Sequence, residues 1–194
     1  QRIDVGALRS VPMEIVSGAI GRTKVHYVAP PAQSLADEVD AFLTWFNQTQ
    51  PKVGPRPLDG LVRAAIAHLW FETLHPFDDG NGRIARAVGD MALACAAGSS
   101  QRYYSLSAQI QRERKAYYDQ LEATQKGDLD VTPWLVWFLG CLLRALQGAG
   151  HMLDSVLMKA RYWHQWAGTP MNARQMKLLN KLLDGFDGHL STSK

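Results

Sequence analysis

The residues best suited to chemistry lie in one segment of twelve, which runs from His75 to Arg86 and reads His-Pro-Phe-Asp-Asp-Gly-Asn-Gly-Arg-Ile-Ala-Arg. Its glycine-rich turn, Gly80-Asn81-Gly82, leads into a predicted helix. Backbone N–H groups in such a turn form an anion-binding nest, and the positive end of the helix dipole strengthens it. The segment therefore predicts a site for phosphate oxygens.

Two arginines and one acid add to this predicted site. Arg83 and Arg86 are three residues apart, so both guanidinium groups lie on one face of the first helical turn and can reach one polyphosphate. Each charge-assisted hydrogen bond contributes roughly 1.5 to 3 kcal/mol. Asp79 is a hard oxygen ligand, suited to Mg²⁺ held by one carboxylate and substrate phosphates. Asp78 is interpreted as a solvated loop residue, because its neighbour fills the metal role.

His75 lies four residues before Asp79 and is the candidate general base. An imidazole near a helix N-terminus tends to stay neutral at pH 7, as a general base must. Each feature also has a structural interpretation: such a turn is often only a turn, paired arginines usually form a solvated face, and a histidine before proline commonly caps a helix. Their combination in one segment favours a nucleotide-phosphate site.

The elements around this segment are predicted to be mostly helical, because apolar residues recur at helical spacing between cap residues. After an irregular start, a β-prone segment closed by prolines predicts a strand or hairpin. The strand or hairpin is expected at 21–28, and helices are expected after the N-cap Ser34, over 58–74, 83–97 and 107–127, after the N-cap Thr132 with an interruption at 148–150, and after the N-cap Asn172.

Composition limits the classes of protein that this chain can be. Its 194 residues, 46% of them hydrophobic, can bury one substantial core. A formal net charge of +3 is too weak to argue for nucleic acid. The longest hydrophobic run, Trp134 to Leu143, is well short of the roughly 20 residues that cross a bilayer. Cys95 and Cys141 fall in apolar helical stretches, so we expect buried thiols and a cytoplasmic protein.

The segment from His75 to Arg86 matches throughout the signature of the Fic family, His-x-Phe-x-(Asp/Glu)-Gly-Asn-Gly-Arg-x-x-Arg. The resemblance extends from about Met13 to Asp187 and is strongest to the bacterial branch, in which a winged-helix domain follows the Fic core. It implies an all-α Fic fold, a helical bundle with a small β-hairpin flap. Residues 1–150 would form the core, with the flap near 21–30, and 151–194 a helical extension whose residues 185–188 resemble the lead into a winged-helix domain that is missing here.

The resemblance implies a protein adenylyltransferase, which moves AMP from ATP to a Ser, Thr or Tyr hydroxyl of a target protein and releases pyrophosphate. His75 would take the proton of that hydroxyl, which attacks the α-phosphate in line. Phe77 would anchor the loop in the core, and Asp79 would bind the Mg²⁺ that bridges the α- and β-phosphates. Such chemistry depends mainly on positioning and electrostatics. Self-modification is a further possibility.

The remaining motif residues would bind the phosphates by the same resemblance. Gly80, Asn81 and Gly82 would cradle the α- and β-phosphates, Arg83 would stabilise the phosphate charge, and Arg86 would hold the γ-phosphate. Some family members transfer phosphocholine or a phosphate from other nucleotide substrates. The complete arginine pair favours ATP as the donor and leaves the other donors open.

The segment from Thr23 to Val28 resembles the family's flap, which pairs its main chain with the target segment by β-strand addition. The pairing positions would be Val25, His26, Tyr27 and Val28. A hairpin that merely covers the core is the alternative. Tyr117 and Gln125 resemble positions that contact the adenosine, although aromatic residues at helical spacing are more often core residues.

Many Fic proteins carry an inhibitory helix, (Ser/Thr)-x-x-x-Glu-(Gly/Asn), whose glutamate pairs with the second motif arginine. Two segments have its spacing without completing it: Ser10 to Glu14 is followed by isoleucine, and Ser34 to Glu38 by valine. We therefore expect the inhibitory glutamate to lie upstream of Gln1 or on another chain, and this chain to be derepressed.

Three other functions are alternatives to the transferase. Glu72 and His75 have the Glu-x-x-His spacing of di-iron bundles, but a second copy is absent from the sequence. The sequence also lacks the Gly-x-x-x-x-Gly-Lys-(Ser/Thr) loop of P-loop ATPases. The third alternative is a non-catalytic module that senses nucleotide and contacts DNA only through the missing C-terminal domain. Turnover of ATP distinguishes this sensor from the enzyme.

Overall fold

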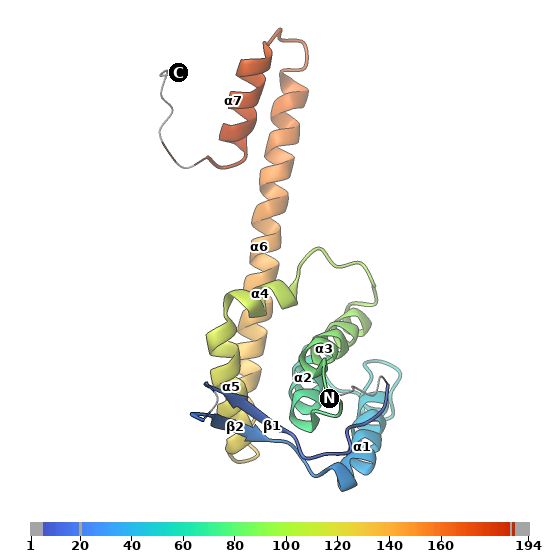
Figure 1. Cartoon of the computed structure of the whole chain (residues 1–194). Helices are drawn as coiled ribbons and strands as arrows, with labels where there is room; N and C mark the ends of the chain where they lie inside the picture. The colour runs from blue at the N-terminus through green and yellow to red at the C-terminus, as the bar shows by residue number, and fades with distance from the viewer. Residues whose placement is uncertain (1–5, 20, 187, 189–194) are drawn as a thin grey trace. The chain divides into compact units, whose positions relative to one another are not determined.

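The structure is a computed structural model that describes residues 6–19, 21–186 and 188 (Figure 1). The predicted extension to residue 194 and the predicted lead at 185–188, with Asp187, lie partly outside the described residues. The described residues form two compact units, which divide between Ala145 and Leu146. The predicted boundary at residue 150, and the role of the second unit as a lead into another domain, stay predictions.

The described part of the chain contains seven α-helices, one short 3-10 helix and two strands. In chain order they are β1 (Glu14–Ser17), β2 (Lys24–Val28), η1 (Ala32–Ser34), α1 (Leu35–Gln48), α2 (Gly60–Leu74), α3 (Asn81–Ala97), α4 (Leu106–Arg112), α5 (Arg114–Lys126), α6 (Thr132–Gln165) and α7 (Ala173–Leu183). The predicted fold class, all-α with a small β-hairpin, is confirmed.

The two strands form an antiparallel hairpin beside α5 (Figure 1). Ile15 pairs with Tyr27 and Val16 pairs with Val25, so His26 is an extra residue in β2. A bulge of this kind turns a side chain in a new direction, and bulges are common next to active sites. β2 confirms the strand predicted within 21–28, whereas β1 lies in the start of the chain that the sequence predicts to be irregular.

The core of the first unit is built around α2 and α3, which pack closely because small residues line their contact. Ala64 of α2 and Ala85 and Ala92 of α3 are fully buried. At Gly89 an added Cβ would lie 3.4 Å from Nδ1 of His68, so a side chain there would press on the neighbouring helix. Close packing of these two helices fixes the loop that joins them, which carries the motif.

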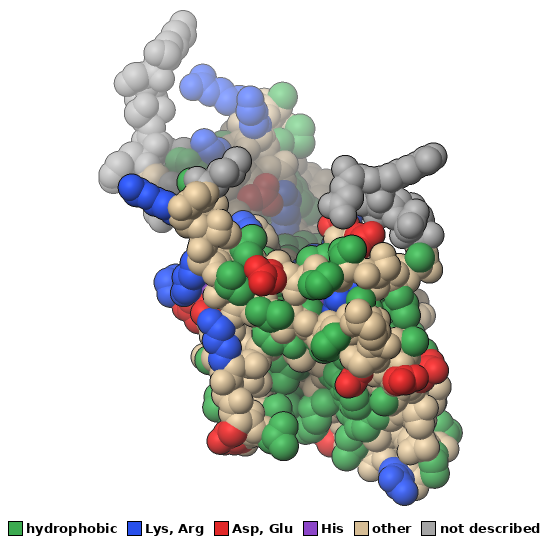
Figure 2. All heavy atoms as spheres, turned by 60° about the horizontal axis from the view of Figure 1, so that its bottom comes forward, with side chains coloured by type: hydrophobic (Ala, Val, Ile, Leu, Met, Phe, Trp, Pro, Cys, Tyr) green, Lys and Arg blue, Asp and Glu red, His purple; other side chains and the backbone are tan. Residues whose placement is uncertain are grey.

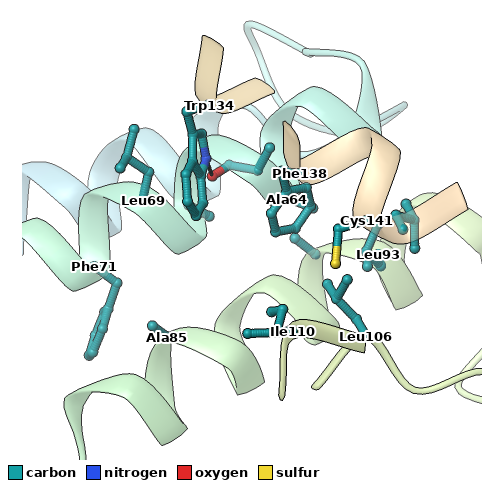
Figure 3. Packing of buried hydrophobic residues seen from close by; sticks show 14 of the residues in the cluster. Ala64, Leu69, Phe71, Ala85, Leu93, Leu106, Ile110, Trp134, Phe138 and Cys141 are labelled. Atoms are coloured by element: carbon teal, nitrogen blue, oxygen red, sulfur yellow. Dashed lines mark hydrogen bonds between the residues drawn. The ribbon is translucent and has the colours of Figure 1, made fainter. Parts of the chain in front are cut away.

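Trp134 and Phe138 of α6 complete this core (Figure 3). Both rings are fully buried, with centroids 5.8 Å apart. Trp134 Nε1 donates a hydrogen bond to the carbonyl of Ala65 at 2.8 Å, so the buried indole keeps a polar partner. Full burial of a Phe-sized side chain contributes roughly 1.5 to 3 kcal/mol.

The single helix predicted over 107–127 is wrong, because the chain forms α4 and α5 with a break at Glu113. The reason is tertiary. The Glu113 carboxylate accepts two hydrogen bonds from Arg144, at 2.5 and 2.6 Å, and one from Gln109 at 2.6 Å. These contacts fix Glu113 at φ −102° and ψ 25°, outside helical geometry, which local propensity does not reveal.

The interruption predicted at 148–150 is also wrong, since α6 continues through both glycines to Gln165. A glycine within a helix costs only about 1 kcal/mol relative to alanine, which a long helix tolerates. The predicted burial of Cys95 is wrong as well: Cys95 is exposed near the end of α3, and Cys141 is buried. Apolar spacing placed Cys95 in the helix but did not show that its last turn reaches the surface.

Two predicted N-caps differ from the structure. Ser34 takes a helical conformation in η1, and its Oγ donates to the carbonyl of Pro31 at 3.1 Å instead of capping α1. Thr132 is itself the first residue of α6, and Oδ1 of Asp130 accepts from its N–H at 2.9 Å. At both helix starts, a residue within three positions provides the hydrogen-bond partner. The predicted starts of the helices are confirmed, and the predicted capping side chains are wrong.

In the second unit, α7 and the later part of α6 are joined by polar contacts. The capping box predicted for α7 is confirmed, because Asn172 and Gln175 exchange hydrogen bonds of 2.9 Å. Lys159 pairs with Asp184 at 2.7 Å, and Trp163 Nε1 donates to Asn180 at 3.1 Å. No side chain of α7 is buried.

No helix among the described residues combines the length and apolar character that a membrane span requires. On the face drawn in Figure 2, hydrophobic side chains gather in the middle, and most of the Lys and Arg side chains lie along the left edge, where acidic side chains accompany them. This face therefore adds no argument for a nucleic-acid partner.

Candidate functional site

The motif loop, residues 75–82, joins the end of α2 to the start of α3. The carboxylate of Asp59 caps the start of α2 by accepting from the N–H groups of Leu61 and Val62. The helix ends at His75, which has a left-handed conformation with φ 46° and ψ 56°. A residue other than glycine rarely adopts this conformation, and Pro76 prevents the helix from continuing. The candidate base thus lies at a forced helix end.

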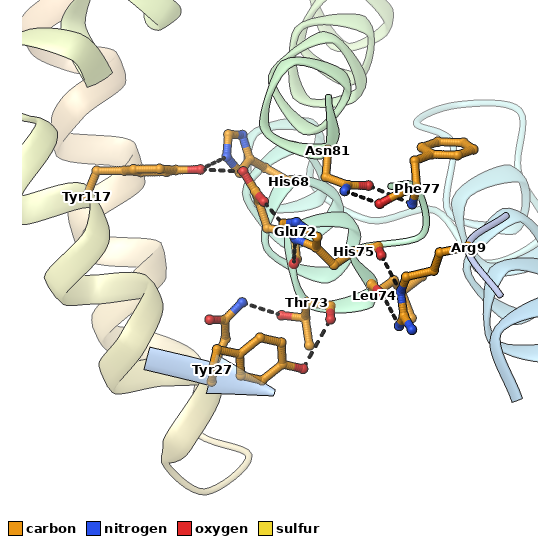
Figure 4. A network of polar contacts seen from close by, with 11 residues as sticks. Arg9, Tyr27, His68, Glu72, Thr73, Leu74, His75, Phe77, Asn81 and Tyr117 are labelled. Atoms are coloured by element: carbon orange, nitrogen blue, oxygen red, sulfur yellow. Dashed lines mark hydrogen bonds and ion pairs between the residues drawn. The ribbon is translucent and has the colours of Figure 1, made fainter. Parts of the chain in front are cut away.

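Asn81 closes the motif loop with its side chain. Its Oδ1 accepts from the N–H of Phe77 at 2.9 Å, and its Nδ2 donates to the carbonyl of Phe77 at 2.7 Å (Figure 4). Asn81 is only 2% exposed, and the Phe77 ring packs against Phe71 with centroids 6.3 Å apart. The Asn81 side chain is therefore used within the loop, which leaves its backbone N–H as the group able to face a phosphate.

The two glycines of the turn have different structural roles: Gly80 adopts a left-handed backbone conformation, and Gly82 lets neighbouring side chains approach the backbone closely. Gly80 has φ 86°, a conformation that favours glycine. At Gly82 an added Cβ would lie 3.1 Å from Oε1 of Glu72 and 3.4 Å from Nη1 of Arg86. Gly82 therefore keeps the N-terminus of α3 open between a buried carboxylate and a guanidinium.

Arg83 and Asp79 form an exposed ion pair of 3.1 Å at the rim of the loop. Their side chains are 73% and 65% exposed, so this pair contributes little to stability, about 0 to 1 kcal/mol. Within the described ranges, Arg86 takes part in no ion pair. Burial lowers the pKa of His68 and raises the pKa of Glu72, and the charge of Arg86 adds to the first shift and opposes the second. Both arginines are thus available to an anionic ligand.

His75 is partly buried beside the end of α2. Its Nδ1 lies 3.3 Å from the carbonyl of Glu72, which can only accept, so Nδ1 carries the proton and Nε2 keeps its lone pair. Burial lowers the pKa of His75 below 6.5; the hydrogen bond to Glu72 opposes this shift, and the charge of Arg9 adds to it. The imidazole is therefore neutral at pH 7, as a base must be.

A buried polar network lies behind the loop. Tyr117 donates to Oε1 of Glu72 at 2.8 Å and accepts from Nε2 of His68 at 3.0 Å (Figure 4). Burial lowers the pKa of His68 to about 3, so this ring is neutral, and burial also raises the pKa of Glu72 and of Tyr117. Sequence reasoning missed this network, whose signal was a histidine and an acid within the mostly apolar α2.

A cavity of about 720 Å³ brings several of the predicted residues together. It is bounded by the hairpin, the end of α2, the start of α3 and α5. Among the predicted site residues its lining includes His26, Tyr27, His75, Gly82 and Gln125. A second hollow of about 400 Å³, on α6 in the second unit, contains none of them.

Tyr117 itself lies outside this lining. Its ring is 3% exposed, packed against the core, and its hydroxyl is used by Glu72 and His68. Its neighbour Tyr118 lines the cavity instead, together with Arg114 and Lys115, which sequence reasoning did not select. The adenosine contact of Tyr117 stays a prediction, and its environment agrees with the core alternative.

Polar contacts fasten the hairpin to α5 and α2. Nδ1 of His26 donates to Oε2 of Glu122 at 2.6 Å, and Ser17 lies 2.5 Å from the other ring nitrogen. The hydroxyl of Tyr27 donates to the carbonyl of Thr73 at 3.1 Å. Hydrogen bonds from Lys126 and His26 lower the pKa of Glu122 to about 2, so it is a carboxylate at every physiological pH.

Two apolar residues of β2, on either side of His26 and Tyr27, are exposed to solvent. Val25 and Val28 are 41% and 58% exposed. The hairpin thus forms one wall of the cavity and leaves these apolar side chains at the surface. Gln125 of α5 also lines the cavity, and its Nε2 donates to Oγ1 of Thr73 on α2 at 3.3 Å.

The helical fold, with a hairpin over the cavity where the motif loop begins α3, defines a class of domain that is known from solved structures. A crystal structure of a Fic family protein from Desulfovibrio desulfuricans G20 matches with a TM-score of 0.62 and 25% identity, over 95% of this chain and 52% of its own. A sequence model of the Fic/DOC family matches residues 1–93, which include the whole motif. The chain belongs to the Fic family.

Curated relatives match over a smaller part of their own length. A protein named uridine 5'-monophosphate transferase, from Xanthomonas campestris pv. campestris (strain 8004), is 36% identical over 89 residues, 45% of this chain and 16% of its own. A protein named protein adenylyltransferase Fic, from Aedes aegypti, is 30% identical over 135 residues, 68% of this chain and 25% of its own. The chain therefore spans a quarter or less of these two relatives.

Proposed function

We propose that this chain is the catalytic part of a protein adenylyltransferase, which transfers AMP from ATP to a hydroxyl of a target protein. One observation carries the proposal: His75, with its proton on Nδ1, lines the same cavity as Gly82, where α3 begins. A base with a free lone pair thus lies beside an N-terminus suited to phosphate. The name of the Aedes aegypti relative supports the choice of reaction.

In the proposed reaction, Nε2 of His75 takes the proton from the target hydroxyl. The hydroxyl oxygen then forms a bond to the α-phosphorus, and the bond between this phosphorus and the bridging oxygen of the β-phosphate breaks. Pyrophosphate leaves with the electron pair. The Nδ1 hydrogen bond to the carbonyl of Glu72 holds the ring in this orientation throughout. General base catalysis of this kind contributes typically 10²- to 10⁴-fold to the rate.

The phosphates would lie at the start of α3. The backbone N–H groups from Gly80 to Gly82 would bind them, and Arg86, which borders Gly82, would reach the γ-phosphate. Arg83 would exchange its exposed partner Asp79 for phosphate oxygen. Charge-assisted hydrogen bonds to phosphate are stronger than the exposed ion pair that they would replace.

Asp79 fits a magnesium ion that arrives with the nucleotide. It is an exposed carboxylate beside the turn, and the described residues contain no cluster of three or more His, Cys, Asp or Glu side chains that would hold an ion alone. Mg²⁺ is commonly bound by one or two carboxylates plus substrate phosphates. When bound, the ion would supply positive charge to the departing pyrophosphate.

The hairpin would receive the target. An extended segment that adds to β2 would pair with its main chain from Val25 to Val28 and so bring a hydroxyl toward His75. The same geometry would serve a segment of this protein itself. The bulge at His26 supports this role, because it interrupts the pairing of β2 with β1 beside the cavity.

A different donor is the second candidate function. The Xanthomonas relative is named as a transferase of uridine 5'-monophosphate, so the family name alone does not fix the base of the nucleotide. Replacing ATP by UTP in the same assay separates the two. A non-catalytic sensor is the alternative outcome, in which nucleotide binds without release of pyrophosphate.

The test is to incubate the chain with Mg²⁺ and ATP labelled at the α- or the γ-phosphate, alone and with bacterial lysate. Transfer of AMP predicts protein-bound label from the α-position only, on a lysate protein or on the chain itself, and none with His75→Ala. Label from UTP instead would establish the other donor. ATP binding without label from either position would favour the sensor and contradict the proposal.

A further inference from the structure

A buried arginine outside the predicted site holds the motif loop. Arg9, near the start of the described residues, is 3% exposed. Its guanidinium and backbone N–H donate only to main-chain carbonyls: Nε to His75 at 2.8 Å, Nη1 to Val11 at 3.0 Å, Nη2 to Pro30 at 2.5 Å and Leu74 at 3.4 Å, and N to Pro76 at 2.9 Å. Figure 4 shows the side chain directed at the end of α2.

Burying this charge is costly, because no carboxylate pairs with Arg9 in the described part of the chain. Burial accordingly lowers the pKa of the Arg9 guanidinium. The cost is offset by the carbonyls at the C-terminal end of α2, which carry the negative end of the helix dipole. Arg9 therefore serves as a side-chain cap for the last carbonyls of α2.

The carbonyls that Arg9 binds belong to consecutive residues around the candidate base. They are those of Leu74, His75 and Pro76. His75 itself has φ 46°, and a residue other than glycine held in this conformation costs on the order of 1 to 3 kcal/mol. Three hydrogen bonds from one residue compensate for this strain and fix the backbone on both sides of the imidazole.

The remaining contacts of Arg9 reach the hairpin. Pro30 follows β2 by two residues, and Val11 precedes β1 by three. The N–H of Ala29 donates to the carbonyl of Met13 at 3.0 Å, which closes the hairpin next to these two residues. The guanidinium of Arg9 thus connects the backbone of His75, the candidate general base, to the two ends of the hairpin that would bind the target.

We propose that Arg9 is a positioning residue of the transfer reaction, which fixes His75 relative to the hairpin and hence to the target hydroxyl. The inference rests on the proposed function. It concerns orientation alone, since Arg9 contacts the main chain of the motif loop rather than the phosphate nest at Gly82. Loss of Arg9 therefore lowers kcat and leaves the affinity for ATP near its original value.

The chain offers a matched control in Arg63. This arginine is 1% exposed, and its Nη2 donates to the carbonyl of Phe46 at 2.7 Å, near the end of α1. Its Nε donates to Thr49 at 3.3 Å. Arg63 is as deeply buried as Arg9 and also donates to a main-chain carbonyl near a helix end, but it has no hydrogen bond to the motif loop.

The experiment compares Arg9→Lys, Arg9→Met and Arg63→Lys by kcat, by KM for ATP and by urea unfolding. Arg9→Met is expected to lower kcat on the order of 10²-fold, the effect of a misplacement of about 1 Å. Arg9→Lys, which keeps the charge and some of the hydrogen bonds, is expected to recover part of this loss. Arg63→Lys is expected to lower stability while kcat stays near its original value.

Three outcomes overturn the inference. One is native kcat in a folded Arg9→Met. Another is an equal loss of kcat in Arg63→Lys at equal stability, which would reduce Arg9 to a structural role. The third is a rise in KM for ATP that accounts for the whole effect.

A readout without nucleotide separates this inference from the proposed function. In protein with ¹⁵N-labelled histidine, His75→Ala identifies the ring signals of His75 among the six histidines. Arg9→Lys is expected to shift those signals, and Arg63→Lys to leave them in place. Unshifted signals in Arg9→Lys overturn the positioning role even if the native chain transfers UMP or transfers nothing.

Discussion

Two walls of the cavity are held in different ways: the motif loop forms the rigid wall, and the hairpin forms the softer wall. The motif loop is fixed by buried groups that bond to its main chain, through Asn81 within the loop and Arg9 behind it. The strands of the hairpin are held mainly by partly buried side chains, through His26 to Glu122 and Tyr27 to the carbonyl of Thr73. Buried main-chain contacts resist local opening, whereas side-chain contacts that water can reach are exchanged more easily.

The difference matches what each wall would have to do. A base must keep its position to within a fraction of an ångström for efficient proton transfer. A surface that receives a polypeptide must open to admit it. The fold therefore places its rigidity where the proposed chemistry occurs and at the two ends of the hairpin, which Arg9 binds, and it leaves the strands between those ends freer to adapt.

The largest expected effect is that of removing the base from the rigid wall. His75→Ala is expected to lower transfer by at least 10²- to 10⁴-fold, the contribution of a general base, while ATP still binds. Label transfer and nucleotide binding by calorimetry measure the two effects. His151→Ala, an exposed histidine of the second unit, is the control. Native transfer by His75→Ala would remove the assignment of the base.

The next effect concerns the phosphate side of the same wall. Arg86→Ala is expected to raise KM for ATP about 10- to 100-fold, because one charge-assisted contact of roughly 1.5 to 3 kcal/mol is lost. The contact is specific to the γ-phosphate, so the affinity for ADP is expected to change much less. Equal losses for ATP and ADP would place Arg86 elsewhere on the phosphates.

Asn81→Ala tests the rigidity of the loop itself. It removes two hydrogen bonds of a buried side chain and leaves the N–H and carbonyl of Phe77 without partners. The free energy of unfolding is expected to fall by about 1 to 3 kcal/mol, and transfer is expected to fall with it. Asn172→Ala, which removes the cap of α7, is expected to lower stability by about 1 kcal/mol without loss of transfer. A loss of transfer in both Asn81→Ala and Asn172→Ala would mean that transfer depends on overall stability and not on the rigidity of the motif loop.

Glu122→Gln tests the softer wall. It weakens the contacts of Glu122 with His26, Lys24 and Lys126 and so loosens the hairpin. KM for the protein target is expected to rise several-fold, with KM for ATP unchanged. Steady-state transfer at varied target and varied ATP separates the two constants. A rise confined to ATP would mean that the hairpin serves the nucleotide instead.

The smallest change is expected in the pH dependence. Burial and the charge of Arg9 lower the pKa of His75, against the opposing hydrogen bond to Glu72, so the acid limb of kcat/KM is expected below pH 6.5. The neutral ring is the active form, hence transfer falls as the pH decreases through that pKa. The carboxyl group of Glu72 also lies near the ring, with its Oε2 3.8 Å from Nδ1. Arg9→Met removes a positive charge, so its acid limb is expected to move to higher pH.

The two walls also differ in what the sequence reveals. The motif loop was predictable because its residues are contiguous, and a turn of Gly-Asn-Gly before a helix has a direct meaning for phosphate. Arg9 and Glu72 were missed, because their roles arise from carbonyls and side chains more than forty residues away. Local patterns contain no information about such contacts.

The errors in the fold have the same origin. Glu113 breaks the predicted helix because Arg144 holds its carboxylate, and β1 forms only because β2 lies beside it. Tyr117 was selected by position, whereas its hydroxyl is used by the buried network behind the loop. Helix positions followed from apolar spacing, and the exceptions followed from tertiary contacts.

The left-handed backbone of His75 has a consequence for how this position evolves. Glycine or asparagine would adopt φ 46° at a lower free-energy cost, so the stability of the fold alone favours one of these residues over histidine. Under the proposed function, selection for the imidazole would oppose this change. In a descendant without the transfer activity, we therefore expect His75 to be replaced before the motif residues whose backbone conformation suits their side chains.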